Sequence, residues 1–333
     1  MDTGYAAVRR SVLARHAART IVRGSLLLAG LSLLCFVLFQ LTPGDFFVEA
    51  HLNSTVSAAD LAALRAHHAL DRPILLKYWY WLGSVSRGEW GFSFAYNRPA
   101  GDLLWARAAN TLLLTVTANV IAWVIAILLG VWSAGRSRKL AGALVGGCVS
   151  VLLALPDLLI VLLLLFAAAR TGLLPLGGMF SAQSAQLAGW PRLSDRLAHL
   201  VLPATALALS MLPPLVEHAR SAMSDVLGST YIRAARASGI SEGRILFRHA
   251  IPAAANALLS LLGLSVGMLL SSSLLVETVF GWPGLGQLLF QATLERDVYV
   301  VIDVVMLSAF LLLAGNFVTD LLQRAADPRI RAE

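Results

Sequence analysis

Between two long apolar runs the chain reads Tyr231-Ile-Arg-Ala-Ala-Arg-Ala-Ser-Gly239-Ile-Ser-Glu-Gly-Arg-Ile-Leu-Phe-Arg-His249-Ala-Ile-Pro252. This segment is basic and too polar to lie in lipid. Its alanines and arginines favour helix, Gly239 suits a helix end, and Ser241 followed by Glu242 suits the start of another helix. We expect two helices that meet at a tight bend. The second should lie across the membrane surface and run to about His249, and Pro252 suits the first turn of the next apolar helix.

The composition indicates an integral membrane protein. Of the 333 residues, 58% are hydrophobic and only 14% are charged, too few to cover a soluble globule of this size. The net charge of +7 comes from residues between the apolar runs, which indicates membrane orientation rather than nucleic-acid binding. Cys35 and Cys148 lie inside apolar runs, so neither a disulfide framework nor a Cys-ligated metal site is expected.

Six apolar runs predict an all-α polytopic membrane protein with six transmembrane helices. A basic segment, residues 1–23, precedes the first helix at 24–42, which is long enough to span and lacks a small-residue cleavage site. Residues 43–110 carry balanced charge, which predicts an extracytoplasmic domain. The other five helices form a core at 111–323, followed by a tail at 324–333. Lys and Arg favour the predicted cytoplasmic segments, so both termini are expected in the cytoplasm.

Prolines interrupt two helices of this core. The third span, near 141–168, contains Pro156 followed by Asp157. A carboxylate at membrane depth is costly unless it faces a wet cavity or a partner, so Asp157 is a candidate pathway residue. Local bending with solvation near the membrane edge is the alternative. The fourth span begins near His199 and contains three prolines, so we expect it to be bent or broken. The remaining spans are expected near 111–134, 254–276 and 299–322.

The basic segment resembles the cytoplasmic EAA loop of the membrane subunits of bacterial ABC importers. The resemblance lies in Ala234-Ala235, Gly239 and Ile251-Pro252, and Arg233 in place of Glu is common in the dipeptide/oligopeptide/nickel branch. In that family a short coupling helix of the loop docks in a groove of a separate ATPase subunit. The resemblance therefore implies a cytoplasmic coupling loop at 218–252. The implied contact residues are Arg233, Ala234, Ala235, Arg236, Gly239, Ile240, Ser241, Glu242 and Arg244.

The residues of that loop alone leave another interpretation open. An Arg- and Ala-rich cytoplasmic loop between two spans is what the positive-inside rule gives any polytopic protein.

A second motif ends the fifth span and reads Glu277-Thr-Val-Phe280-Gly-Trp-Pro283-Gly284-Leu-Gly286. Glu, then Phe, then Pro-Gly-Leu-Gly, followed by Arg296-Asp297, resembles the same family. The glycines predict a tight turn with left-handed backbone and close approach. We interpret Glu277, Phe280, Pro283, Gly284 and Gly286 as candidates for a re-entrant or extracytoplasmic gate. An ordinary hairpin loop is the alternative.

The insert after the first helix resembles the extracytoplasmic domain of the peptide-type permeases at Leu70-Asp71-Arg72-Pro73, Tyr78 and Gly88-Glu89-Trp90-Gly91. The tryptophans Trp79, Trp81 and Trp90 also fit an interfacial aromatic belt. Both interpretations are open at this point.

The resemblance covers most of the chain and implies a type I ABC importer-like permease subunit of the bacterial cytoplasmic (inner) membrane. Such a subunit forms half of the pathway for di- or oligopeptides. The implied partners are a second homologous permease, two ATP-binding subunits, an extracytoplasmic substrate-binding protein and membrane lipid, with no nucleic acid. No cofactor is expected on this chain, because ATP and Mg belong to the ATPase partners.

The motifs of two enzyme classes are missing from the sequence. No Gly-Lys pair occurs, so the chain has no phosphate-binding loop, and no His-Glu-x-x-His occurs. We therefore expect a transport subunit and not an enzyme. The alternative function is a stand-alone secondary transporter or channel that uses Asp157 and Glu277 as ion or proton sites.

Overall fold

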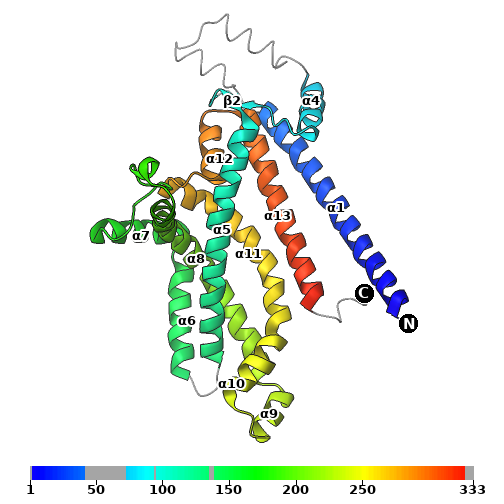
Figure 1. Ribbon diagram of the computed structural model, residues 1–333, viewed down its shortest axis with the longest axis vertical. Coiled ribbons are helices and arrows are strands. Elements are labelled where there is room, and N and C mark those ends of the chain that lie inside the picture. Colours follow the sequence, from blue (N-terminus) through cyan, green and yellow to red (C-terminus); the bar gives the residue numbers. More distant parts are fainter. Residues whose placement is uncertain (1, 42–72, 94, 135–138, 327–333) are drawn as a thin grey trace, which may run out of the picture. The chain divides into compact units, whose positions relative to one another are not determined.

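The computed structural model describes residues 2–41, 73–93, 95–134 and 139–326. Apart from one short β-hairpin, the regular elements of these residues are helices (Figure 1), which confirms the all-α class. The elements are α1 (Asp2–Leu41), α4 (Ile74–Ser86), β1 (Phe92–Ser93), β2 (Arg98–Pro99), α5 (Ala100–Ala134), α6 (Lys139–Ala154), α7 (Asp157–Thr171), η1 (Ser184–Gln186), α8 (Trp190–Leu227), α9 (Thr230–Ala237), α10 (Glu242–Ile245), η2 (Leu246–Ala250), α11 (Ile251–Phe280), α12 (Leu285–Leu294) and α13 (Val298–Ala326).

Five described helices are long and apolar enough to cross a membrane, and a sixth span results if the bent pair α6 and α7 counts as one. The five are α1 at 18–38, α5, α8, α11 at 257–280 and α13 at 298–324. These spans correspond to the expected ones, although the helices α1, α5 and α8 begin well before the predicted starts. Leu70-Asp71-Arg72 of the predicted extracytoplasmic domain lies outside the described residues, as does most of the predicted tail.

The third predicted span is broken at Pro156. Its backbone is extended, with φ −59° and ψ 142°, and its carbonyl accepts the first bonds of α7 from Leu159 N and Ile160 N at 2.9 and 3.2 Å. Because proline lacks an N–H and keeps the preceding residue out of the helical region, α6 stops and α7 restarts in a new direction. Segments 142–154 and 157–171 meet at 102°.

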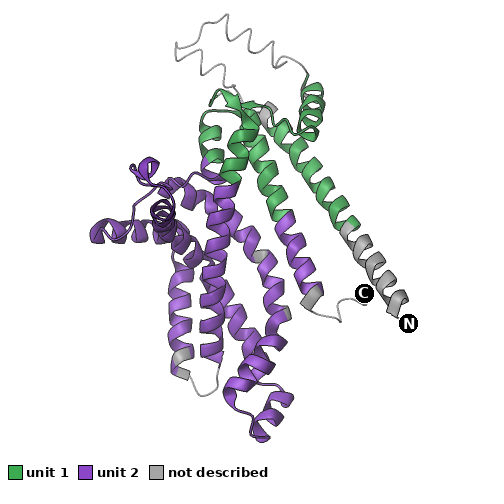
Figure 2. Ribbon diagram, viewed as in Figure 1, with its two compact units in different colours: residues 1–108, 288–313 green, residues 109–287, 314–333 purple. Residues whose placement is uncertain are grey.

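One compact unit comprises residues 109–287 and 314–333 (Figure 2), and α8 is its central helix. α8 packs against α6, α7 and α11, and 72% of its apolar window is buried, against 11% for α1. Leu207 and Val216 are fully buried there. Pro203, Pro213 and Pro214 lie inside a continuous helix. This span is therefore not broken at its prolines, because tertiary packing offsets their local cost.

The other unit comprises residues 1–108 and 288–313 (Figure 2). Within it, side-chain hydrogen bonds join α4 and the β-hairpin to the start of α13. The Trp81 Nε1 donates to Asp303 Oδ1 at 3.0 Å, and the Ser93 hydroxyl donates to Asp297 Oδ2 at 2.7 Å. The Ala95 N–H also donates to that oxygen. Both carboxyl groups are fully buried. Trp81 is thus a core residue here, whereas Trp79 is exposed.

Candidate coupling and gate sites

The basic segment folds as the two helices α9 and α10 around a bend at Gly239. The backbone there is left-handed, with φ +77°. Gly239 N donates to Arg236 O at 3.0 Å and Ile240 N donates to Ala235 O at 3.2 Å, the paired bonds of a Schellman motif. The sequence-based expectation of a glycine-terminated helix and a tight bend is confirmed.

An ion pair closes the bend from outside. Arg236 Nε donates to Glu242 Oε1 at 2.6 Å, and Arg236 Nη2 donates to Glu242 Oε2 at 3.2 Å, so both oxygens of the carboxylate are engaged. The hydrogen bonds from Arg236 lower the pKa of Glu242, and those to Glu242 raise the pKa of Arg236. Solvent screening weakens such exposed pairs, but the two hydrogen bonds from the Arg236 guanidinium to the Glu242 carboxylate fix the angle between α9 and α10.

The start of α10 differs in one detail from the expectation. Ser241 has the extended backbone of an N-cap residue, with φ −62° and ψ 144°, but its side chain makes no capping hydrogen bond. Glu242 is in the first turn as expected, and it bonds Arg236 across the bend. The carboxylate of Glu242 therefore ties the two helices together.

The loop is continuous with two packed helices. Ala250 and Ala254 are buried against Ala219 and Met223 near the end of α8. Ile232 and Ile245 are fully buried as well, one from each short helix. A displacement of α9 and α10 would therefore be passed to α8 and α11 through close-packed side chains.

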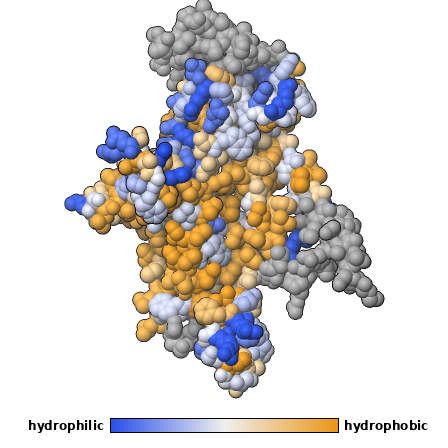
Figure 3. All heavy atoms as spheres, viewed as in Figure 1, coloured by the Kyte–Doolittle hydropathy of each residue, from blue (hydrophilic) through white to orange (hydrophobic). Residues whose placement is uncertain are grey.

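The predicted contact residues form the surface of this loop. All nine are exposed or half-buried, and Figure 3 shows hydrophilic residues gathered around α9 and α10, next to the hydrophobic surface of α5 and α6. Two features were missed from the sequence. Residues 246–250 form one turn of π-helix, and Phe247 within it is 74% exposed. An α-helical pattern in the sequence gives no signal for either feature.

The second motif places Glu277 at the N-terminus of α12. Its Oε2 accepts from Gly286 N at 2.6 Å and from Gln287 N at 3.2 Å, while its Oε1 accepts from the Thr111 hydroxyl at 2.7 Å. The Leu285 N–H donates to the same hydroxyl at 2.7 Å. A negative group at a helix N-terminus satisfies N–H groups that have no partner within the helix. Sequence reasoning missed Thr111, which is far away in the chain.

Glycines allow this close approach. A Cβ on Gly284 would lie 2.4 Å from the Glu277 carboxyl, and one on Gly286 would lie 2.4 Å from the Leu274 Cα. The left-handed residue of the turn is Gly281, with φ +61°, and neither Gly284 nor Gly286 has positive φ. The expected close approach is confirmed, and the expected left-handed backbone belongs to Gly281.

Further hydrogen bonds fasten the turn on both sides. The Trp282 Nε1 donates to Asn110 O at 3.1 Å, and the Asn110 amide donates to Pro283 O at 2.8 Å. The carbonyl of buried Phe280 accepts from Gly178 N at 2.8 Å. With 10 residues, α12 is about 15 Å long at 1.5 Å per residue, half the hydrocarbon thickness. The geometry is thus that of a tight turn followed by a short helix that is held at its N-terminus. Its role as a gate stays a prediction.

Asp157 lies apart from the Glu277 hydrogen bonds. It is half-buried in the first turn of α7 and accepts from the Ser272 hydroxyl at 3.4 Å. No hydrogen bond among the described residues joins Asp157 to Glu277. Its role as a pathway residue stays a prediction.

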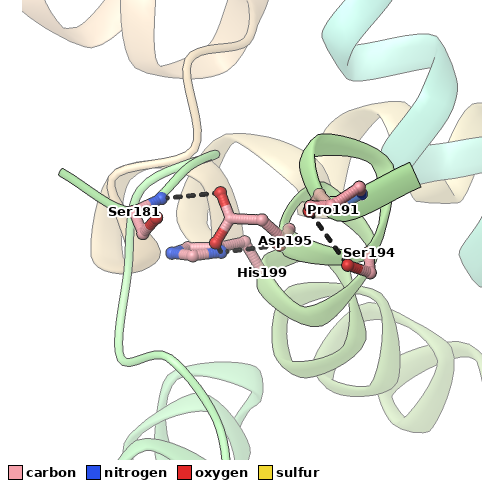
Figure 4. A network of polar contacts seen from close by, with 5 residues as sticks. All are labelled: Ser181, Pro191, Ser194, Asp195 and His199. Atoms are coloured by element: carbon pink, nitrogen blue, oxygen red, sulfur yellow. Dashed lines mark hydrogen bonds and ion pairs between the residues drawn. The ribbon is translucent and has the colours of Figure 1, made fainter. Parts of the chain in front are cut away.

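A further polar network, not anticipated from the sequence, joins the loop after α7 to the start of α8 (Figure 4). Asp195 Oδ2 accepts from Ser181 N at 2.9 Å, and the buried His199 Nδ1 lies 2.8 Å from Asp195 O. The Ser194 hydroxyl donates to Pro191 O at 2.9 Å. The spacing of Asp195 and His199, one helical turn, was the available signal.

Comparisons with known proteins identify the family of the chain. Residues 126–332 match the family model described as binding-protein-dependent transport system inner membrane component. The chain belongs to this family. It is 33% identical to the oligopeptide transport system permease protein AppB of Bacillus subtilis, over 91% of this chain and 95% of that protein. It is 31% identical to the dipeptide transport system permease protein DppB of Escherichia coli K12, over 91% and 94%.

A solved structure confirms the fold. An inward-facing structure of the MetNI methionine ABC transporter aligns with a TM-score of 0.53 at 19% identity, covering 68% of this chain and 96% of that chain. This protein is thus a membrane permease subunit of an ABC importer of the inner membrane, and ATP hydrolysis belongs to partner subunits. Membership of the family implies ATPase and substrate-binding partners.

Proposed function

We propose that this permease subunit forms half of a translocation pathway for di- or oligopeptides and couples that pathway to ATP hydrolysis on partner chains. The named functions of the relatives support the substrate class, since AppB and DppB each align over nine-tenths of this chain. The names of the two relatives specify different peptide lengths, so we propose both dipeptides and longer peptides as substrates.

The observation that carries the coupling proposal is the fixed bend at Gly239. The Schellman bonds and the Arg236–Glu242 pair give α9 and α10 one defined angle, and buried alanines continue the loop into α8 and α11. When the ATPase subunits close, they push a rigid element, and the attached helices change between inward-open and outward-open states. The exposed arginines and Phe247 provide the surface that an ATPase groove would contact.

The assembly we propose contains a second homologous permease, two ATP-binding subunits that hold ATP and Mg, and an extracytoplasmic substrate-binding protein. The loop at 218–252 and both termini face the cytoplasm, in accord with their excess of arginine. The α12 turn, fastened by Glu277, is the proposed gate element. Asp157 is proposed to face the pathway.

A pair of glycine substitutions tests the coupling proposal. Gly239→Val places a β-branched side chain on left-handed backbone, whereas Gly243 has ordinary backbone and open space around it. In vesicles that contain the assembled importer, Gly239→Val is expected to abolish uptake and the stimulation of ATPase activity by loaded binding protein. Gly243→Val should retain both activities. Normal uptake by Gly239→Val would refute the fixed bend as the coupling element.

A further inference from the structure

Helix α4 has two apolar faces, one packed on α1 and the other exposed. On the inner face, Tyr78 and Trp81 each lie 5.3 Å, ring centroid to ring centroid, from Phe36 of α1. The opposite face is exposed: Leu75 is 65%, Leu76 49%, Trp79 65% and Tyr80 58% accessible. We call these four residues, Leu75, Leu76, Trp79 and Tyr80, the outer face of α4. Such a contiguous apolar surface marks a site that contacts something other than water.

We propose that the outer face of α4 is immersed in the membrane, so that α4 is an interfacial helix lying in the leaflet at the C-terminal end of α1. The proposed topology makes this the outer leaflet. The depth of α4 in the bilayer does not depend on that orientation.

The first support is the level at which α4 contacts α1. The Tyr78 hydroxyl lies 3.0 Å from the Ser32 hydroxyl. Ser32 precedes Leu38, the last residue of the α1 span, by nearly two helical turns, which is about 9 Å along the axis at 1.5 Å per residue. Interfacial helices insert their apolar face to a depth of about 5–10 Å. The contact therefore places α4 within the bilayer boundary and not above it.

The second support is continuity with a lipid-exposed surface. Only 11% of the apolar window of α1 is buried, and Leu34 and Leu38 are 52% and 53% exposed. Side chains of this kind on a membrane span contact acyl chains. Because α4 packs directly on this helix, its outer face extends the same apolar surface.

The third support is the order of residue types along the outer face. Trp and Tyr are enriched at membrane interfaces because each has an apolar body and a polar tip. At helical spacing the same face continues into Ser86 and then Arg87, both exposed. The face thus changes from apolar to polar toward its C-terminal end, as expected of a helix that rises from the bilayer into water.

Spin-label depth measurements test the proposal on the assembled importer. Cysteine is placed by Trp79→Cys or Leu76→Cys in a background carrying Cys35→Ala and Cys148→Ala, and a nitroxide is attached. Glu89→Cys, at an exposed position shortly after α4, is the aqueous reference. The importer is reconstituted in vesicles of phosphatidylethanolamine and phosphatidylglycerol. Collision rates are measured with oxygen, which enriches in lipid, and with a polar nickel chelate, which lipid excludes.

The ratio of oxygen to nickel collisions at positions 76 and 79 should exceed that at 89 by about tenfold, because the hydrocarbon excludes the polar reagent. A ratio equal to that at 89 would show a water-exposed face and overturn the proposal. Protection from both reagents, before or after addition of substrate-binding protein, would show a protein contact and overturn it as well. If Trp79→Cys does not assemble, Leu76→Cys gives the same test.

Discussion

The hydrogen bonds of Glu277 lead to a quantitative prediction for the substitution Glu277→Gln. The glutamine oxygen can still accept from Gly286 N and Gln287 N, but its NH₂ group replaces Oε1 and faces the Thr111 hydroxyl. In the native protein that hydroxyl accepts from Leu285 N and donates to Oε1. In the variant the hydroxyl can accept from the new NH₂ group, but the NH₂ group cannot accept from it, so the hydrogen bond that the hydroxyl donates is lost. The two bonds from Gly286 N and Gln287 N become weaker because their acceptor is no longer charged.

The expected cost follows from these bonds. Losing a buried hydrogen bond and the charged acceptor costs about 1–3 kcal/mol in the closed state of the α12 turn. Since each 1.4 kcal/mol is a factor of ten, the amides of Gly286 and Gln287 should exchange with solvent about 5- to 150-fold faster. Glu277→Ala would remove acceptors from three donors and is expected to cost more or to prevent assembly.

Hydrogen exchange on the assembled importer in lipid, with peptides that cover 285–294, provides the assay. Glu295→Gln is the matched control, because this exposed acid lies just after α12 and makes no described bond to its N-terminus. It should leave the exchange rates unchanged. Unchanged exchange at Gly286 and Gln287 in Glu277→Gln would refute the view that this carboxyl holds the turn closed.

Two other predictions concern the basic loop and α4. Because bonds from Arg236 lower the pKa of Glu242, the contribution of this pair is complete above the ordinary glutamate pKa and is lost as the pH falls through the lowered value. Amide exchange at residues 238–242 should therefore accelerate in acid. Glu242→Gln should lack this acid-dependent acceleration, and an acceleration that persists in this variant would contradict the role of the Arg236–Glu242 pair. Trp81→Phe removes the donor to Oδ1 of buried Asp303, whose Oδ2 already lacks a hydrogen-bond partner among the described residues. The substitution should destabilise the importer by about 1–3 kcal/mol in thermal unfolding. Trp79→Phe, on the exposed face, should change stability by less than about 0.5 kcal/mol, and equal effects of the two substitutions would contradict the burial difference.

Local rules explain what the sequence could predict. The bend at Gly239 depends on helix propensity and on a glycine cap, and both can be recognised from a few neighbouring residues. The spans depend on hydropathy and length alone. The close approach at Gly284 and Gly286 was likewise predicted, because glycine has no Cβ and lets the backbone of a turn come close to its neighbours.

Tertiary context explains what the sequence could not predict. Pro156 indicates an interruption, but the 102° bend depends on how α7 packs against α8. Trp79 and Trp81 are indistinguishable in composition, and only the rotation of α4 against α1 makes one exposed and the other buried. The contact of Thr111 with Glu277 joins distant parts of the chain, which no local pattern reports.

The proposed coupling requires that the basic loop contacts an ATPase subunit in the cytoplasm. Cross-linking measures this most directly, with Phe247→Cys in the cysteine-free background and a short bifunctional reagent applied to the assembled importer. Leu173→Cys, exposed in the loop after α7, is the control. We expect an adduct of the permease and the ATPase subunit at position 247 and none at 173. Absence of that adduct at 247, or labelling of 247 by an impermeant thiol reagent from outside the cell, would contradict a cytoplasmic contact between the loop and the ATPase.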